Sequence, residues 1–263
     1  MTRIIVLIKD IPDLNEIKID PSTRRPIVDM AKRRLNDLDK RALETAIRVK
    51  ETSGAEVITL SMGDDRTKTC VLEALAMGAD AAYIINDPRL RGMDAYVTSS
   101  VLSSAVRKIG SFAMIIAGEL SLDSMGSQVG PRVAELLDLV QITYVRELKF
   151  EAGKFIAVRD LEDLDEVVEV EPPLLVTVAR EINEPRIPSL MNIMKAKRKP
   201  VTEWNAEVLG LNFDELKISS KVEVLEVQVP EVRRKRIVIK ADKVEEAVVK
   251  LLSALTTEGV LEK

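Results

Sequence analysis

The sequence predicts an α/β protein with a doubly wound, mostly parallel sheet, and three observations lead there. Continuous apolar runs such as Arg3–Lys9 are rich in β-branched residues, as expected of strands buried on both faces. Segments with a helical spacing of apolar residues separate these runs. Gly54 and Gly78 then end the first two helices. Strands are expected at Arg3–Lys9, Glu56–Ser61, Ala81–Ile85 and Phe112–Gly118, and helices at Arg41–Glu51, Arg66–Met77, Asp94–Ile109 and Val129–Leu137.

The pattern changes after Leu139. Tyr144–Phe150 and Phe155–Asp160 are typical of antiparallel strands, and Leu174–Ala179 indicates another buried strand. We expect the main α/β domain to span residues 1–200.

Residues 201–263 are predicted to form an extended C-terminal arm and a helix. Lys221–Val229 is expected to be extended, and Pro230–Arg236 to be a basic hinge. Asp242–Leu255 has the apolar spacing of an amphipathic helix. Because the preceding domain looks complete without it, the apolar face of this helix predicts contact with another subunit.

Composition excludes several kinds of chemistry. The 263 residues include no His and one Cys, which excludes nucleophile–His catalysis, His-ligated metals and disulfides. Carboxylate or Lys chemistry is the alternative left open by composition, but we expect a bound cofactor as the carrier of reactivity, with no catalytic side chain and no metal. Cys70 lies in an apolar run and is expected to be a buried hydrophobic residue.

Charge and hydropathy limit the partners. A net charge of −4 argues against nucleic acid and anionic membrane surfaces. The longest apolar stretches, such as Ala113–Ala117, are far shorter than the about 20 residues of a membrane helix, so no membrane insertion is expected. Met1–Val6 leads directly into a strand without a cleavage site, which predicts a cytoplasmic protein.

Ligands of doubly wound sheets bind in a crevice beyond the carboxyl ends of the strands. Lys9–Leu14, Met62–Arg66 and Gly118–Gly130 are expected there. In the loop Gly118–Pro131, N–H groups at the helix start can receive a phosphate, with Ser127 and Gln128 donating beside them. Gly126 and Gly130 would allow close approach of a ligand. The alternative is an ordinary loop whose Ser and Asp cap the helix.

Two shorter segments also have alternative interpretations. Asn36 either caps the first helix or hydrogen-bonds a ligand in the crevice. Met62-Gly63-Asp64 either forms the floor of an adenosine pocket or is a simple turn.

Asn183–Pro200 is the least ordinary segment, with three prolines, two methionines and a cationic end. One interpretation packs its apolar residues into the core. The other is a docking surface, since Leu190, Met191 and Met194 beside Lys195 would offer apolar side chains next to positive charge.

The order of motifs resembles one family. The pattern Asn-Glu-Pro-Arg-x-Pro-Ser-Leu-x-x-Ile-Met-Lys-Ala-Lys-x-Lys-Pro at 183–200 is similar to the signature of the β (small) subunit of electron-transfer flavoproteins. The resemblance covers residues 3–200, and the tail helix resembles the family's C-terminal arm. The other matches are Val6-Leu7-Ile8-Lys9 with Pro12-Asp13, Asn36-x-x-Asp39 before Ala42-x-Glu44-x-Ala46, Ala76-Met77-Gly78-Ala79-Asp80, and Asp123-x-x-x-x-Gln128-Val129-Gly130-Pro131.

The resemblance implies an adenine nucleotide α-hydrolase-like fold within a heterodimer. An FAD, bound mainly by the α subunit, would carry electrons from NADH or acyl-CoA-type dehydrogenases to a quinone oxidoreductase or ferredoxin. Residues 1–200 would hold a second nucleotide, and residues 201–263 would contact the α subunit. Leu190 matches a leucine that inserts into partner dehydrogenases, and Glu166 falls near the shared FAD. The residues implied to line the second nucleotide are Leu7, Asn36, Met62, Asp123, Ser127, Gln128, Val129 and Gly130.

The second nucleotide is AMP in simple members of this family. In electron-bifurcating members it is an FAD that accepts hydride from NADH. Val129 stands where AMP-binding members have Thr, and losing that hydroxyl favours FAD, whose pyrophosphate can bind main-chain N–H groups. The counterweight is Gly126-Ser127, which departs from the Asp-Thr-Ala of the bifurcating branch. Separately, Glu162-Asp163-Leu164 replaces the family's Asp-Gly-Gly in the turn before Glu166. An alternative of another class is an ATP-binding module resembling the universal stress proteins.

Overall fold

The fold was obtained as a computed structural model that describes residues 3–231 and 236–261. The chain divides into two compact units, Met1–Val227 and Gln228–Lys263. The boundary expected at residue 200 falls inside the first unit, because the strand β13 (Val201–Trp204) pairs with the main sheet. Of the predicted basic hinge, residues 232–235 lie outside the described residues.

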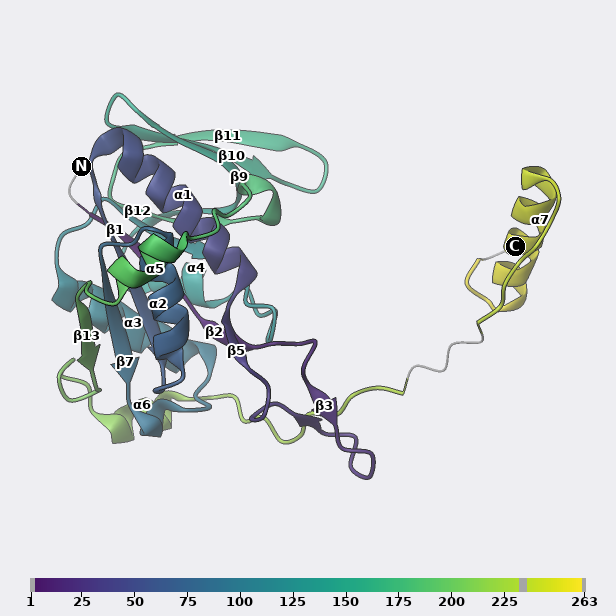
Figure 1. The fold of residues 1–263 in the computed structure, drawn as a ribbon, viewed down its shortest axis with the longest axis horizontal. Coiled ribbons are helices and arrows are strands. Elements are labelled where there is room, and N and C mark those ends of the chain that lie inside the picture. The colour runs from purple at the N-terminus through teal and green to yellow at the C-terminus, as the bar shows by residue number, and fades with distance from the viewer. Residues whose placement is uncertain (1–2, 232–235, 262–263) are drawn as a thin grey trace. The chain divides into compact units, whose positions relative to one another are not determined.

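A nine-stranded sheet forms the centre of the first unit, in the order β11-β10-β9-β12-β8-β1-β6-β7-β13. The strands from β9 to β13 in this order are parallel, and β10 and β11 extend the sheet as an antiparallel ribbon. The mostly parallel, doubly wound sheet is therefore confirmed (Figure 1). The remaining strand bounds are β1 Arg3–Leu7, β6 Glu56–Gly63, β7 Ala81–Asn86, β8 Met114–Gly118, β9 Val140–Glu151, β10 Lys154–Asp160, β11 Asp165–Val170 and β12 Leu174–Val178.

Helices cover both faces of the sheet, and an apolar cluster lies between the sheet and the helices on each face. One cluster joins the apolar sides of α1, α2 and α5 to the sheet. The other lies under α3, α4 and α6. Helix bounds are α1 Asp37–Ser53, α2 Thr67–Met77, α3 Ala95–Ile109, α4 Val129–Leu136, α5 Leu190–Ala196 and α6 Phe213–Ser219, with short 3-10 turns at Pro88–Leu90 and Arg180–Ile182.

Short strands between β1 and α1 leave the main sheet. β2 (Asp10–Pro12) pairs with β5 (Arg33–Leu35), and β3 (Lys18–Ile19) forms a hairpin with β4 (Pro26–Ile27). In Figure 1 this hairpin reaches away from the sheet.

Cys70 is buried in the first cluster, as predicted. The elements that were not predicted include β11, β13, α6 and the short strands β2 to β5. No helix in the described part of the chain is long and apolar enough to cross a membrane.

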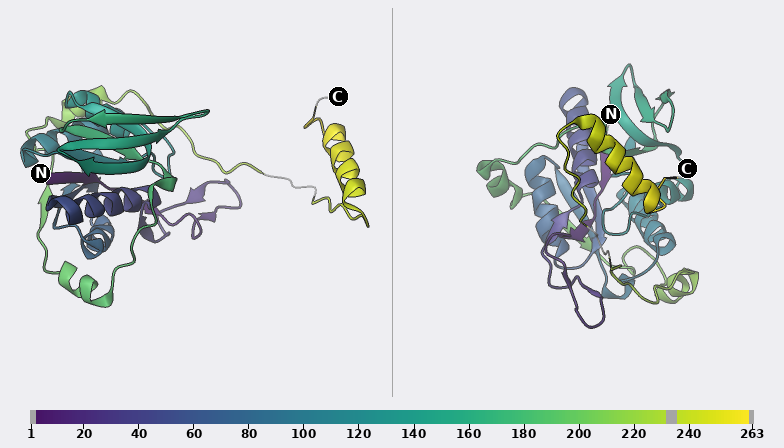
Figure 2. Two further views of the ribbon diagram at one scale, coloured as in Figure 1. Left: turned by 90° about the horizontal axis from the view of Figure 1, so that it is seen from above. Right: turned by 90° about the vertical axis from the view of Figure 1, so that its right-hand side faces the viewer.

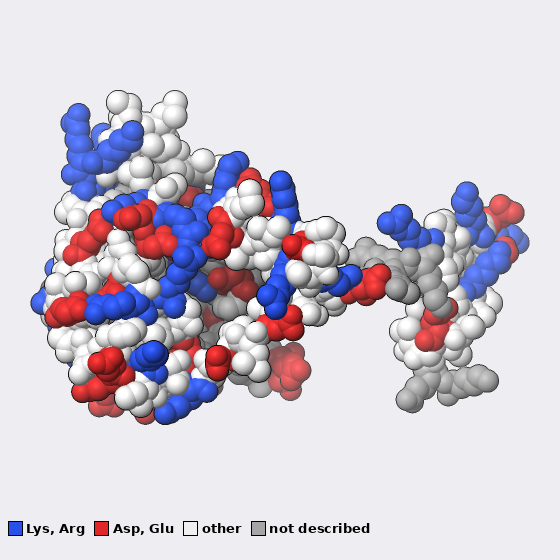
Figure 3. Space-filling model, turned by 90° about the horizontal axis from the view of Figure 1, so that it is seen from below, with Lys and Arg blue, Asp and Glu red and all other residues white. Residues whose placement is uncertain are grey.

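The face drawn in Figure 3 mixes acidic and basic side chains over the first unit.

The second unit contains the predicted amphipathic helix as α7 (Val244–Thr257). None of its residues is buried within the described chain, and Val244, Val249 and Leu252 are among its exposed apolar side chains. The expectation that this face contacts another subunit stays a prediction.

Candidate functional site

The chain winds in opposite directions from β1, which makes the gap between β1 and β8 the topological switch point. From β1 the chain adds β6 and β7 on one side, then crosses to β8 on the other. The carboxyl ends of β1 and β8, with the loop Glu119–Gln128, are called the switch-point edge below. Ligands of doubly wound folds bind at such an edge.

Asp39, in the first turn of α1, ties the two strands together at this edge. Its Oδ2 accepts a hydrogen bond from the Lys9 N–H at 2.8 Å, and its Oδ1 accepts one from the Gly118 N–H at 3.2 Å. Burial raises the pKa of Asp39 to about 7, against the effect of these donors. The helix sits so close that a Cβ on Gly118 would lie 2.6 Å from the Leu38 Cβ. Gly118 is therefore required by packing.

The loop after β8 is fastened by two side chains from outside it. Lys9 Nζ donates to Asp123 Oδ1 at 2.9 Å and to Ser121 Oγ at 3.2 Å. Although partial burial opposes it, the contact with Lys9 lowers the pKa of Asp123. The segment Lys9–Leu14 is thus found at the expected edge, but the role of the Lys9 side chain in fastening the loop was not predicted.

Asn36 fastens the same loop, which corrects the capping interpretation. Asn36 stands at the N-cap position of α1, but its side chain makes no capping hydrogen bond. Instead, Nδ2 donates to the Leu120 carbonyl at 2.9 Å, and Oδ1 accepts from the Leu122 N–H at 3.2 Å. The buried amide therefore positions the loop main chain.

The start of α4 is left without a side-chain cap, so the interpretation that Ser or Asp caps it is wrong. Gln128 occupies the N-cap position, and its Oε1 accepts from Arg132 at 3.0 and 3.2 Å. Ser127 has a left-handed main chain with φ of 48°. The first N–H groups of α4 therefore have no side-chain acceptor, which fits an anionic ligand.

Three predicted lining residues pack into the core beside this edge. Leu7 is buried in the cluster under α3 and α4, and Met62 and Val129 are half-buried against it. Gly130 is also a packing residue, because a Cβ there would lie 2.7 Å from Thr177 Cγ2. The expectation that Gly130 lets a ligand approach is corrected to close packing of α4 on β12.

Glu166 lies apart from the other predicted residues. It belongs to β11, and β10, β9 and β12 separate that strand from β8. Its Oε2 accepts from Arg159 Nη1 at 2.6 Å. The structure thus places Glu166 on the ribbon and not at the switch-point edge.

The segment Asn183–Pro200 is held against α1 by a buried ion-pair cluster. Glu44, only 4% exposed, accepts from Arg186 Nε at 2.7 Å and from Arg48 Nε at 2.7 Å. Arg186 Nη1 also reaches Glu51 at 2.6 Å. Although burial opposes it, hydrogen bonds from Arg186 and Arg48 lower the pKa of Glu44.

Other polar residues of the segment complete this frame. Asn183 Nδ2 donates to the Arg41 carbonyl at 3.0 Å and to Thr45 Oγ1 at 2.8 Å. Ser189 caps α5, and Lys199 Nζ donates to the Leu75 and Ala79 carbonyls at the end of α2. The polar residues therefore fix the segment at both ends.

The apolar residues of α5 divide between core and surface. Ile193 and Ala196 pack on the first cluster. Leu190, Met191 and Met194 are 82%, 63% and 71% exposed, and Lys195 is exposed beside them. Figure 2 shows α5 on the outer side of the helical layer. The alternative that these residues fill the core is wrong for all three.

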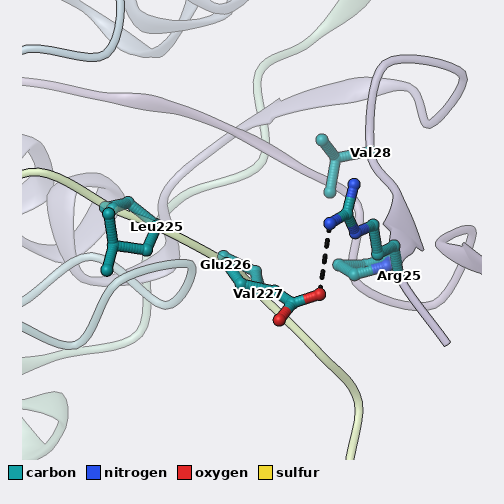
Figure 4. A pocket seen from close by; sticks show the side chains of 7 residues that line it. Arg25, Val28, Leu225, Glu226 and Val227 are labelled. Carbon is teal, nitrogen blue, oxygen red and sulfur yellow. Dashed lines mark hydrogen bonds and ion pairs between the residues drawn. The ribbon is translucent and has the colours of Figure 1, made fainter. Parts of the chain in front are cut away.

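A cavity of about 380 Å³ lies elsewhere, between the hairpin and the end of the first unit. Arg25 Nη2 pairs with Glu226 Oε1 at 3.1 Å across it (Figure 4). This pair fastens residues 224–227 to the hairpin. The switch-point edge and the α5 surface remain the candidates, and together they are typical of a nucleotide-binding α/β subunit that works with protein partners.

Comparisons with known proteins give the family. Residues 27–209 match the family described as "Electron transfer flavoprotein domain". The chain is 38% identical over 261 residues to electron transfer flavoprotein subunit beta of Thermoanaerobacterium thermosaccharolyticum, covering 98% of this chain and 100% of the relative. It is 40% identical over 211 residues to the caffeyl-CoA reductase-Etf complex subunit CarD of Acetobacterium woodii, covering 80% of each. It is 35% identical over 248 residues to the Megasphaera elsdenii subunit beta, covering 91% and 92%.

The chain belongs to the electron transfer flavoprotein family, as a β subunit. Such subunits carry out electron transfer in heterodimers with an α subunit and in association with flavin. The resemblance to electron-transfer flavoproteins is thereby confirmed, and the stress-protein-like alternative is set aside.

Proposed function

We propose that this subunit holds a second nucleotide at the switch-point edge, and that this nucleotide is FAD. The observation that carries the proposal is the start of α4, which has no side-chain cap beside a loop fixed by Lys9 and Asn36. A fixed loop with unpaired N–H groups suits a pyrophosphate. When bound, the FAD would accept hydride from NADH and release single electrons.

The residues proposed to line this nucleotide take different parts. Main-chain groups at Ser127 and Gln128 would bind phosphate oxygens, and the Gln128 side chain would donate through Nε2, since Arg132 already occupies its Oε1. Leu7, Met62 and Val129 would form the apolar side. Asn36, Asp123 and Gly130 would act through the loop and helix that they hold in place.

The partners follow from the two exposed apolar surfaces. We infer that α7 contacts the α subunit, which binds most of the shared FAD near Glu166. The surface formed by Leu190, Met191, Met194 and Lys195 would dock acyl-CoA-type dehydrogenases, a quinone oxidoreductase or ferredoxin. The relative in a caffeyl-CoA reductase-Etf complex supports a CoA-ester enzyme as one partner. We place the complex in the cytoplasm.

Anaerobic reduction of the purified αβ complex by NADH alone tests this function. If the switch-point FAD accepts hydride, stoichiometric NADH bleaches flavin absorbance without any dehydrogenase present. Dithionite reduction provides the total flavin for comparison. A complex that dithionite bleaches and NADH leaves fully oxidised would contradict electron bifurcation and favour simple transfer with AMP at this edge.

A further inference from the structure

Tyr144 has a main-chain conformation that tyrosine rarely adopts. Its φ is 57°, in the left-handed region, which is an outlier for a bulky side chain and normal for glycine. It lies where β9 has an extra residue opposite β12, since that pairing shifts register between Ile142 and Val145. The pairing with β10 shifts register further along β9, at Arg146. Bulges of this kind occur next to functional sites, where they redirect a side chain.

Two charged side chains hold this bulge in place. The buried Glu119 accepts from the Tyr144 N–H at 3.1 Å and from Thr177 Oγ1 at 2.5 Å. Arg159 donates to the Thr143 carbonyl at 2.9 Å and to Thr143 Oγ1 at 3.1 Å. A buried carboxylate is thus used to fix the main chain of one residue, and no Lys or Arg pairs with it among the described residues.

The bulge lies on β9, which β12 separates from β8, and Glu119 links it to the switch-point edge. Glu119 is the first residue of the loop after β8, so its contact places the Tyr144 main chain against that loop. Thr177, the other donor to Glu119, is the residue on which Gly130 of α4 packs. Tyr144 is 46% exposed as a residue, whereas Tyr83, Phe150, Phe155 and Trp204 are paired ring to ring.

We propose that Tyr144 is a binding residue of the switch-point edge, whose ring stacks on a planar heteroaromatic ring of the nucleotide, and that Glu119 is its positioning residue. The inference rests on the proposed function, which supplies the nucleotide. It explains why tyrosine stands where glycine would fit the main chain better. A tyrosine ring can stack on either the flavin or the adenine ring, so the same interaction would bind both.

The test uses the αβ complex stripped of nucleotide and titrated separately with FAD and with AMP. Tyr144→Gly is expected to keep or raise the melting temperature, because the left-handed main chain suits glycine. It should weaken one class of binding sites about tenfold, as loss of a stacked ring does. Tyr144→Phe should retain the affinity, and bound-flavin fluorescence should rise in the glycine variant only. A change in the FAD titration alone identifies flavin as the stacked ring, and a change in both titrations identifies adenine, since FAD carries both rings.

Two further variants make the outcome decisive. Ala152→Gly relieves another left-handed residue, in the β9–β10 turn, and should leave both titrations unchanged. Glu119→Ala should weaken the same site as Tyr144→Gly, and Glu119→Gln should restore it by accepting through its amide oxygen. Equal affinities of wild type and Tyr144→Gly in both arms, or a lower melting temperature of Tyr144→Gly, would overturn the inference. Wild-type complex that binds one FAD and no other nucleotide would contradict the proposed function as well.

Discussion

Two buried carboxylates on α1 hold the two candidate sites, and they do so in opposite ways. Asp39 fixes the switch-point edge by accepting from main-chain N–H groups, and burial raises its pKa to about 7. Glu44 fixes the docking segment between Arg186 and Arg48, and its pKa is lowered. α1 therefore carries two buried acids of opposite behaviour. Burial disfavours the ionised form of Asp39, whereas the ion pairs of Glu44 require its ionised form.

The different partners of Asp39 and Glu44 match the different requirements of the two sites. Main-chain donors hold strands at a fixed spacing and leave the edge without a strong local charge. The ion pairs of Glu44 with Arg186 and Arg48 hold the docking segment against α1, so the apolar residues of that segment can stay exposed. Substitutions at the residues that hold each site should distinguish these two modes, because their expected effects on stability differ in size.

Glu44→Ala is expected to have the largest effect. It leaves Arg186 and Arg48 without their buried partner, and breaking a buried ion pair costs about 3–5 kcal/mol. Urea unfolding should report this loss, and limited proteolysis should cut within 183–200. Glu51→Ala is the matched control, since Glu51 holds the same arginine from an exposed position and should cost less than about 1 kcal/mol. Equal losses in both variants would contradict the framing role of Glu44.

Asp39 should give the folded state a distinctive pH dependence. Between the ordinary carboxyl pKa of 3.8 and about 7, the folded chain keeps a proton that the unfolded chain has released. Stability should therefore fall as pH rises through this window, by up to about 1.4 kcal/mol per pH unit. Asp39→Asn should remove that slope in urea unfolding.

The pH control is Asp64→Asn at the neighbouring strand end. The Arg66 side chain lowers the pKa of Asp64 to about 2, so its contribution is present above 3.8 and disappears only in stronger acid. This variant should keep the wild-type slope between pH 4 and 7. An unchanged slope in Asp39→Asn would show that burial does not hold this carboxyl protonated.

Gly130→Ala tests the packing of α4 on β12. The added Cβ would meet Thr177 at 2.7 Å, and overpacking of this kind costs about 1–3 kcal/mol. Gly126→Ala in the same loop has open space around the new Cβ and should change stability by less than about 0.5 kcal/mol. Thermal unfolding of both variants compares them directly, and a neutral Gly130→Ala would return this glycine to a ligand-contact role.

Leu190→Ala should leave stability unchanged and slow electron delivery to a partner. An exposed anchor contributes about 1–3 kcal/mol to docking, which is roughly tenfold or more in the apparent KM for the partner. Ile193→Ala, three residues along α5 and packed on the core, should instead lower the melting temperature. Loss of stability in Leu190→Ala with an unchanged KM would make Leu190 a structural residue.

Most of the parallel sheet could be predicted because its strands are local, continuous apolar runs. β11 was missed because its alternating Asp, Glu and Val residues form a strand only through pairing with β10. β13 has four residues and depends on pairing with β7, more than a hundred positions earlier. Such partners are set by tertiary structure, which local periodicity does not contain.

The same limit applies to the site. The segments at the carboxyl edge were predicted from topology, and the exposed residues of α5 from their setting between prolines and lysines. The role of Asn36 could not be predicted, because capping and loop fixation require the same residue at the same position. Glu119 gave no local signal, since its partners Tyr144 and Thr177 come from two later strands.

The nucleotide content of the wild-type αβ complex tests the central claim most directly. The complex would be purified without added nucleotide, denatured, and its released nucleotides separated and quantified against the protein. We predict two FAD per heterodimer, and a Val129→Thr variant should shift one of them toward AMP. One FAD and one AMP per wild-type heterodimer would contradict FAD at the switch-point edge, and one FAD with no second nucleotide would contradict a nucleotide site there altogether.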